Sequence, residues 1–289
     1  MMNRKRMLTR VSLILLIGFA LLLPTSPANA QESIVSGWSY AQSFGTDPSA
    51  IVPLPSNWRI DKATSVRSVG TWAAAGTVTE LRAGDDMSSV ATNGIYNYGA
   101  GPAATATDRA IGWVSSGSAT KSGNLYLYLR NNAPTNSLGK VTVSYDVEKY
   151  RSGSNSAGFA VQLYYSTDGS TWTSAGSNFL TTFSADADNA GFANAPGATQ
   201  TVSNQVLTLA TPIAPGGSLY LAWNYSVMSG STSTNAQGLG IDNVSLGSPL
   251  QPTAITLRGL SASSGGTALP VMGLALAGLL VGAVVVRRK

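Results

Sequence analysis

The stretch that decides the fold is Val141-Thr142-Val143-Ser144-Tyr145-Asp146-Val147-Glu148, followed by Phe159-Ala160-Val161-Gln162-Leu163-Tyr164-Tyr165. Apolar residues alternate with polar or small ones in both segments. A period of two places one row of side chains on one face of a pleated strand. The polar connection 151–158 is too short and polar for a helix and suits an antiparallel return. We therefore predict two neighbouring strands within 140–172, with Gly169 in the turn that follows.

The same alternation recurs along the chain at a spacing of roughly ten residues. Further strands are predicted at 34–44, 108–114, 124–130, 206–209, 219–225 and 239–246. The Gly- and Tyr-rich segment 93–102 is predicted to be a loop, and 182–201 a long polar connection. Helical periodicity is absent between 31 and 267. This pattern predicts an all-β chain folded as a two-sheet antiparallel β-sandwich.

The first 30 residues have the composition of a secretory signal peptide. Four basic residues precede an unbroken apolar run at 11–23, and Ala28-Asn29-Ala30 supplies the small residues at which a signal peptidase cuts. A plain N-terminal membrane anchor is the alternative, but the short apolar run and the cleavage site favour a signal peptide. We expect the mature chain to begin at Gln31 outside the cytoplasm.

A second apolar segment lies at the C-terminus. Residues 271–286 contain no charge and are followed at once by Arg287-Arg288-Lys289. With 268–270 this run approaches the ~20 residues that cross a bilayer, and the basic end suits the cytoplasmic side. A buried core helix would be amphipathic and would not stop on three basic residues. We predict a transmembrane anchor at 268–289, a linker at 248–267 and a β-sandwich domain at 31–247.

Net charge and missing residue types exclude several classes of function. Seven of the 18 basic residues lie in the two ends, whereas all 13 acidic residues lie between them, so the overall charge of +5 does not describe the domain. A slightly acidic domain argues against nucleic-acid binding. The chain has no Cys and no His, and so lacks the usual zinc ligands, the His general base and the Cys nucleophile. Without disulfides, a domain of this size must be held by its core.

The tail resembles known sorting signals. Leu269-Pro270-Val271-Met272-Gly273 resembles the Leu-Pro-x-Thr-Gly signal of sortase substrates, with Met272 in place of the Thr after which the enzyme cuts. The order of motif, apolar helix and basic end is also that of exosortase and rhombosortase signals. The resemblance implies a partner enzyme of the sortase type at Leu269, Pro270 and Gly273, and attachment to the membrane or the cell wall.

Several segments of the domain resemble the jelly-roll modules of exported bacterial proteins. They are Leu54-Pro55 with Trp58, 107–112, 143–148 with Arg151, 165–169 with Trp172, 214–221 with Trp223, and 238–246. The resemblance covers about 38–247. It implies a jelly-roll fold at the cell surface and no assigned catalysis or ligand. Where the family has a second Asp in the last strand, this chain has Asn243.

Two loops resemble known motifs without completing them. Asp186-Ala187-Asp188-Asn189 begins like an EF-hand loop, but Ala190 and Gly197 occupy positions that need oxygen ligands, so we interpret it as a solvated loop. Residues 166–172 resemble the Asp-box of sialidase propellers with one residue fewer. We interpret that segment as having a structural role in a β-hairpin.

Asp146 and Glu148 lie on one face of their predicted strand, an arrangement also open to a glycosidase carboxylate. A glycosidase needs a second carboxylate about 5–9.5 Å away, which a sequence cannot supply. We favour solvent-facing charges, with Glu148 and Arg151 as a structural ion pair.

Tyr126, Tyr128 and Tyr164 occupy the polar-facing positions of their strands. They could form a flat aromatic platform on which sugar rings stack. The alternative is that cross-strand tyrosines only stabilise the sheet.

Asp242 is the candidate metal ligand. Jelly-roll modules often hold a structural calcium with an Asp of the last strand, backbone carbonyls and an N-terminal acid, and by that resemblance Asp242 and Glu32 are the calcium ligands. The alternative is that Asp242 lies at a strand margin and caps a turn.

Three functions follow from these features. The first is a non-enzymatic cell-surface module, structural or adhesive, displayed by the C-terminal anchor. The second is a carbohydrate-binding module that uses the aromatic platform for a glycan. A hydrolase ranks last, because no His-based triad or recognisable acid pair is present.

Overall fold

The computed structural model describes residues 32–35 and 37–249. The predicted signal peptide with Ala28 and Ala30, the linker beyond Pro249, and the predicted anchor with Leu269, Pro270 and Gly273 lie outside these residues. Within the described part, no helix has the length and apolar character needed to cross a membrane.

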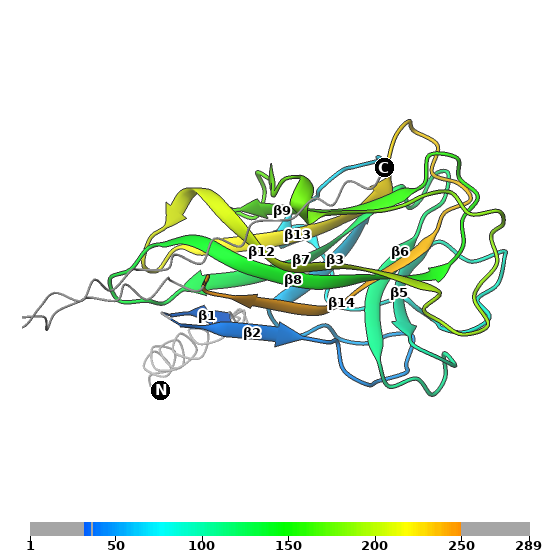
Figure 1. Cartoon of the computed structure of the whole chain (residues 1–289), viewed down its shortest axis with the longest axis horizontal. Helices are drawn as coiled ribbons and strands as arrows, with labels where there is room; N and C mark the ends of the chain where they lie inside the picture. Colours follow the sequence, from blue (N-terminus) through cyan, green and yellow to red (C-terminus); the bar gives the residue numbers. More distant parts are fainter. Residues whose placement is uncertain (1–31, 36, 250–289) are drawn as a thin grey trace, which may run out of the picture. The chain divides into compact units, whose positions relative to one another are not determined.

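The described residues form two sheets of seven strands each, here called sheet A and sheet B (Figure 1). Sheet A has the order β1 (Glu32–Ile34), β7 (Ser122–Asn131), β13 (Ser218–Val227), β9 (Phe159–Ser166), β10 (Thr173–Ser174), with β3 (Trp58–Ala63) also beside β7 and β11 (Leu180–Phe183) also beside β9. Sheet B has the order β12 (Ala198–Ile213), β8 (Leu138–Arg151), β14 (Gly238–Gly247), β6 (Arg109–Val114), β5 (Gly94–Gly99), β4 (Leu81–Ala83), with β2 (Ser39–Gln42) also beside β14. The only helices among these residues are two 3-10 turns, Trp72–Ala74 and Ser177–Phe179.

For residues 32–35 and 37–249, the prediction of an all-β fold with two sheets is confirmed. The prediction of purely antiparallel pairing is wrong at two places, because β1 runs parallel to β7 and β4 runs parallel to β5. Both exceptions involve short strands of three residues. Few ladder hydrogen bonds fix their direction, so the path of the connecting loops decides it.

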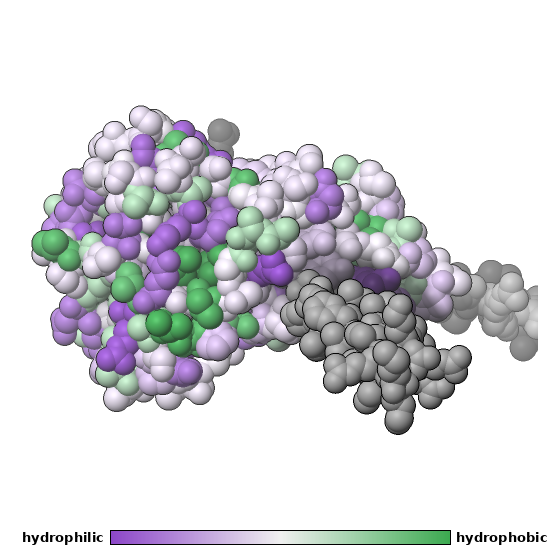
Figure 2. All heavy atoms as spheres, turned by 180° about the vertical axis from the view of Figure 1, so that it is seen from behind, coloured by the Kyte–Doolittle hydropathy of each residue, from purple (hydrophilic) through white to green (hydrophobic). Residues whose placement is uncertain are grey.

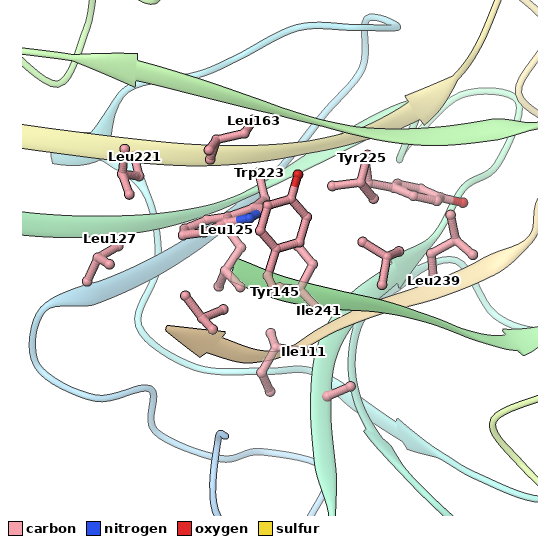
Figure 3. Close-up of a cluster of buried hydrophobic side chains, with 14 of the residues drawn as sticks. Ile111, Leu125, Leu127, Tyr145, Leu163, Leu221, Trp223, Tyr225, Leu239 and Ile241 are labelled. Carbon is pink, nitrogen blue, oxygen red and sulfur yellow. The ribbon is translucent and has the colours of Figure 1, made fainter. Parts of the chain in front are cut away.

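The main core lies between the sheets and is built from the inward rows of strands in both of them (Figure 3). Trp58 of β3 and Trp223 of β13 stack with ring centroids 5.5 Å apart, and Tyr145 of β8 meets Trp223 edge-on at 5.7 Å. Tyr145 belongs to sheet B and Trp223 to sheet A, so this contact joins the two layers. Each fully buried large apolar side chain contributes roughly 1.5–3 kcal/mol.

The predicted pairing of the two strands in 140–172 is wrong. β8 lies in sheet B between β12 and β14, whereas β9 lies in sheet A beside β13. The connection 152–158 therefore crosses from one sheet to the other. Both strands bury their apolar rows in the same core from opposite sides, so the alternation identified their buried faces but not their partners.

The segment 93–102, predicted as a loop, contains the fully buried strand β5. Its tyrosines form a stack with β8: Tyr96 and Tyr98 lie 5.0 Å apart, and Tyr98 and Tyr150 lie 4.4 Å apart. The rings lie over glycine backbone, since a Cβ on Gly240 would come within 3.0 Å of Tyr98 and 3.3 Å of Tyr150. The glycine of β5 at position 99 instead leaves room for a charged side chain, since a Cβ there would meet the Arg109 guanidinium.

Two other boundaries differ from the prediction. Residues 34–44 form two strands in different sheets, β1 and β2, joined through Gly37 with φ +73°. β12 begins at Ala198, inside the predicted polar connection, and runs for 16 residues. Its outward positions are polar because one face is open to solvent, and this composition hid the strand.

Candidate functional site

The three candidate tyrosines lie on the outer face of sheet A. Tyr126 of β7 and Tyr164 of β9 flank Ala222 of β13 in one cross-strand row. Tyr128 and Tyr220 are cross-strand neighbours in the next row and stack with centroids 4.8 Å apart.

Tyr126 does not present a binding surface. It is fully buried, and its hydroxyl donates to Asp61 Oδ2 at 2.6 Å. Trp172 covers it with ring centroids 5.5 Å apart and is fixed by a 2.8 Å bond from its Nε1 to the Gly70 carbonyl. The prediction that Tyr126 faces solvent is therefore wrong, because segments distant in sequence cover this face.

Trp72 covers the second row. Its ring lies 5.7 Å from Tyr128 and 5.7 Å from Tyr220, and the Arg59 guanidinium lies 4.8 Å from the Trp72 ring. The outer face of sheet A is thus a small second core rather than an open platform, with Tyr128 and Tyr164 half-buried in it. The segment 66–79 that forms the cover shows weak patterning, and only Trp72 could have signalled its role.

Asp146 and Glu148 share the outer face of sheet B but are held by the protein itself. Asp146 accepts bonds from Asn243 Nδ2 at 3.0 Å and Thr201 Oγ1 at 2.5 Å. Glu148 is buried and accepts from the Tyr150 hydroxyl at 2.5 Å. Burial raises the pKa of Glu148, and the Tyr150 hydrogen bond opposes that shift.

The predicted Glu148–Arg151 ion pair is wrong. Arg151 is buried and instead donates to the carbonyls of Ser89 at 2.7 Å and Ser88 at 3.3 Å, and also to that of Ala236. Residues 148 and 151 are three apart in a strand, so their side chains leave opposite faces. The guanidinium ties together two loops that cover the end of sheet B.

Asp242 is the most unusual side chain of the domain. It is fully buried in the middle of β14, and neither carboxylate oxygen has a hydrogen-bond partner among the described residues. The turn-cap alternative is therefore wrong. Burial raises the pKa of Asp242 to about 8, and the nearby carboxylates of Glu148, Asp108 and Asp146 add to the shift. The amide of Asn243 lies close enough to oppose it in part, without the alignment of a hydrogen bond.

The strand register gives no support to Glu32 as a partner of Asp242. Glu32 lies in β1 of sheet A opposite Leu129, whereas Asp242 lies in sheet B opposite Asp146. Within 32–35 and 37–249, no group of three or more His, Cys, Asp or Glu is arranged to hold a metal ion. Asp242 supplies two free oxygens that suit calcium, and backbone carbonyls would have to complete the 6–8 ligands that it takes.

Two acidic loops have structural roles. Asp186 accepts from Lys149 Nζ at 2.6 Å, from Gln237 Nε2 at 2.8 Å and from the Gly153 amide at 2.9 Å. Asp168 accepts from the amides of Ser170 and Thr171, both at 2.7 Å, and these bonds lower its pKa. Both carboxylates hold loops, as hydrogen-bonded carboxylates commonly do.

A polar hollow lies between two loops that sequence reasoning passed over. It has a volume of about 440 Å³ and is here called the loop pocket; it is lined by Ser154, Asn155, Ser156, Ala157, Ser229, Gly230, Thr232, Thr234 and Asn235. The loops connect β8 to β9 and β13 to β14. Their only sequence signal is a high density of Ser, Thr and Asn, which is also typical of ordinary connections.

A larger, more apolar groove of about 700 Å³ crosses the outer face of sheet B over β2, β14, β8 and β12. Its lining includes small side chains such as Ala41, Ser144 and Ser245, and also Val206, which has 48% of its surface exposed. Pro249, the last described residue, also lines it.

Comparison with known proteins gives distant likenesses. No family model and no curated protein matches the chain. The K1 adhesin domain of Lys-gingipain from Porphyromonas gingivalis is 13% identical, over 74% of this chain and 99% of that one, with a TM-score of 0.34. The K2 adhesin domain of Lys-gingipain is 12% identical, over 73% and 98%, with a TM-score of 0.36. TmCBM61, solved with β-1,4-galactotriose, is 12% identical, over 65% and 86%, with a TM-score of 0.27. Likenesses of this size say nothing about what this chain binds.

Proposed function

We propose that this chain is an exported, non-enzymatic module of the jelly-roll type that is held at the cell surface by its C-terminal tail, where it serves structure or adhesion. The sequence at the two ends supports the location. The small signal-peptidase site precedes the domain, and the apolar run with its basic end follows it.

The observation that carries the proposal is that the carboxylates which could take part in catalysis are bonded to groups of the protein itself. Asp146, Glu148 and Asp186 each accept hydrogen bonds from protein groups. The bonds to Asp146 and Asp186 join different elements, and the bond from Tyr150 to Glu148 lies within β8. A glycosidase instead needs one carboxyl group to protonate the leaving oxygen and another to act on the opposite side of the sugar. The domain uses its carboxylates to hold its framework together, which favours a structural or adhesive module.

The molecular surface fits exposure to solvent. On the face in Figure 2, apolar patches are interrupted by hydrophilic and neutral side chains. The large apolar side chains that are most exposed, Ile51 and Val90, belong to loops. Scattered apolar side chains are normal on a protein that works in water.

Carbohydrate binding is the second candidate function, and the loop pocket favours it. Its lining consists of hydroxyl, amide and small side chains, which suit a neutral polar ligand. The aromatic platform gives less support, because Trp72 and Trp172 already cover much of it.

A structural calcium ion at Asp242 belongs to the same proposal. The two free oxygens of this buried carboxylate support it. Removal of calcium tests it, as set out below.

The function is tested with cells that display the full chain and cells that lack it. We expect displaying cells to aggregate or to attach to immobilised envelope material more than the controls. Equal attachment would argue against adhesion. Turnover of polysaccharides or esters by the purified full chain would overturn the non-enzymatic assignment.

A further inference from the structure

We propose that the loop pocket binds a neutral saccharide. The inference rests on the proposed adhesive function and names its ligand class and its site. The two loops that line it follow β8 and β13, at the end of the sandwich on the right in Figure 1. Its volume of about 440 Å³ lies within the range of about 300–1,000 Å³ that is usual for small-molecule sites.

The lining has free hydrogen-bonding groups. Within the described part of the chain, the hydroxyls of Ser156, Ser229 and Thr234 make no hydrogen bond to the protein, and all three residues are exposed. A hydroxyl both donates and accepts. These groups can therefore match the hydroxyls of a sugar, each of which also donates and accepts.

The lining favours uncharged ligands by its chemistry. The residues that form the pocket include no Asp, Glu, Lys or Arg. The charge of a bound carboxylate or phosphate is commonly balanced by Arg, Lys or a helix N-terminus, and the lining residues supply no such charge. An uncharged lining of hydroxyls and amides therefore favours a neutral polyhydroxylated ligand.

Asn155 holds the two loops in place before any ligand arrives. It is buried, and its side-chain Nδ2 donates to the carbonyls of Thr232 at 3.0 Å and Thr234 at 2.8 Å. Its backbone amide donates to the Asn235 carbonyl at 3.1 Å, and its Oδ1 accepts from the Ala157 amide at 3.0 Å. One side chain thus fixes both walls of the pocket.

Two further contacts support the second loop. Arg67 Nη2 donates to the Gly230 carbonyl at 2.8 Å, and Ser233 Oγ donates to the Ser116 carbonyl at 2.7 Å. Ordering a loop on binding costs affinity, and a loop that is already ordered avoids this cost. The loop pocket is therefore preorganised, unlike an ordinary connection.

The test uses the purified full chain in detergent on an array of neutral and acidic glycans, followed by titration with the neutral glycan that binds best. Ser156→Tyr and Thr234→Tyr each fill the pocket from an exposed position, so the core is untouched. Thr135→Tyr, on an exposed loop at the opposite end of β8, is the matched control.

We expect binding to neutral glycans that weakens by about tenfold or more in both filling variants and is unchanged in the control. Binding that is kept in both variants, or that is lost in Tyr128→Ala instead, would overturn the site. An array without any neutral ligand would overturn it too. Cells that still attach in the adhesion experiment would then show that the adhesive function stands without this pocket.

Discussion

Asp242 and Asp146 face each other directly across strands β14 and β8 on the outer side of sheet B. Like charges in this relation destabilise a sheet. Asn243 Nδ2 relieves Asp146 with a hydrogen bond of 3.0 Å, whereas both oxygens of Asp242 are without a partner among the described residues. The unfavourable electrostatic energy of this pair therefore falls mainly on the buried carboxyl group of Asp242.

The first prediction concerns pH in the absence of divalent cations. Burial raises the pKa of Asp242 from 3.8 to about 8, so the folded chain keeps a proton that the unfolded chain releases. This stabilising contribution is complete below the unfolded pKa and is lost as pH rises through about 8. We expect the free energy of unfolding to fall between pH 5 and pH 9, on the order of a few kcal/mol for this group.

Glu148 and Asp61 also have raised pKa values and add to the pH dependence of the wild type. Both remain in Asp242→Asn, so the difference between the two proteins isolates the contribution of Asp242. Denaturant unfolding of the full chain at each pH measures it. We expect the wild type to lose more stability than Asp242→Asn as pH rises. Parallel pH profiles would show that Asp242 is ionised or solvated in the folded chain.

The second prediction concerns calcium at neutral pH. A bound cation would use the free oxygens of Asp242 and stabilise the folded state by mass action. We expect a chelator to lower the melting temperature of the full chain and Asp242→Asn to lose that sensitivity. Asp186→Asn, which removes a carboxylate bonded to Lys149, is the control and should keep it. A melting curve unmoved by the chelator would exclude a stabilising calcium ion.

The third prediction concerns the second core. Tyr126→Phe removes the hydroxyl that donates to Asp61 Oδ2, leaving an oxygen of a half-buried carboxylate without that donor. We expect a loss of about 1–3 kcal/mol in the free energy of unfolding. Tyr164→Phe, half-buried on the same face, should change it by less than about 0.5 kcal/mol. Equal effects of the two substitutions would contradict the structural role of Tyr126.

The fourth prediction concerns the tail. The full chain should fractionate with membranes or cell wall, and a chain ending at Ser264 should be released into the medium, because the apolar run 271–286 is removed. Immunoblots of each fraction measure this. Equal partitioning would remove the anchor. Met272→Thr should raise wall-linked material where a sortase is present, and no change would mean that the resemblance at 269–273 is incidental.

Local patterns determined which face of a strand is buried. Val141, Val143 and Val147 lie in the core, as the period of two predicts, because side-chain direction along a strand is fixed by its own backbone. The same reasoning placed Tyr126 and Tyr164 together on the opposite face of sheet A. It failed for β5, where Gly99 leaves room for the Arg109 side chain, a packing role that no local pattern reveals.

Tertiary structure decided which strands pair and which side chains are covered. The chain crosses between sheets after β8. Trp172 and Trp72 arrive from distant segments, Trp172 to cover Tyr126 and Trp72 to cover the row of Tyr128 and Tyr220. The environment of Asp242 and the loop pocket also join residues far apart in sequence. The sequence by itself determined the composition, the buried face of most strands, and the apolar and basic patterns at the two ends, because these are local properties. Only the fold decided which carboxyl group is left without a partner and which loops meet, because burial and pairing depend on every layer that packs around them.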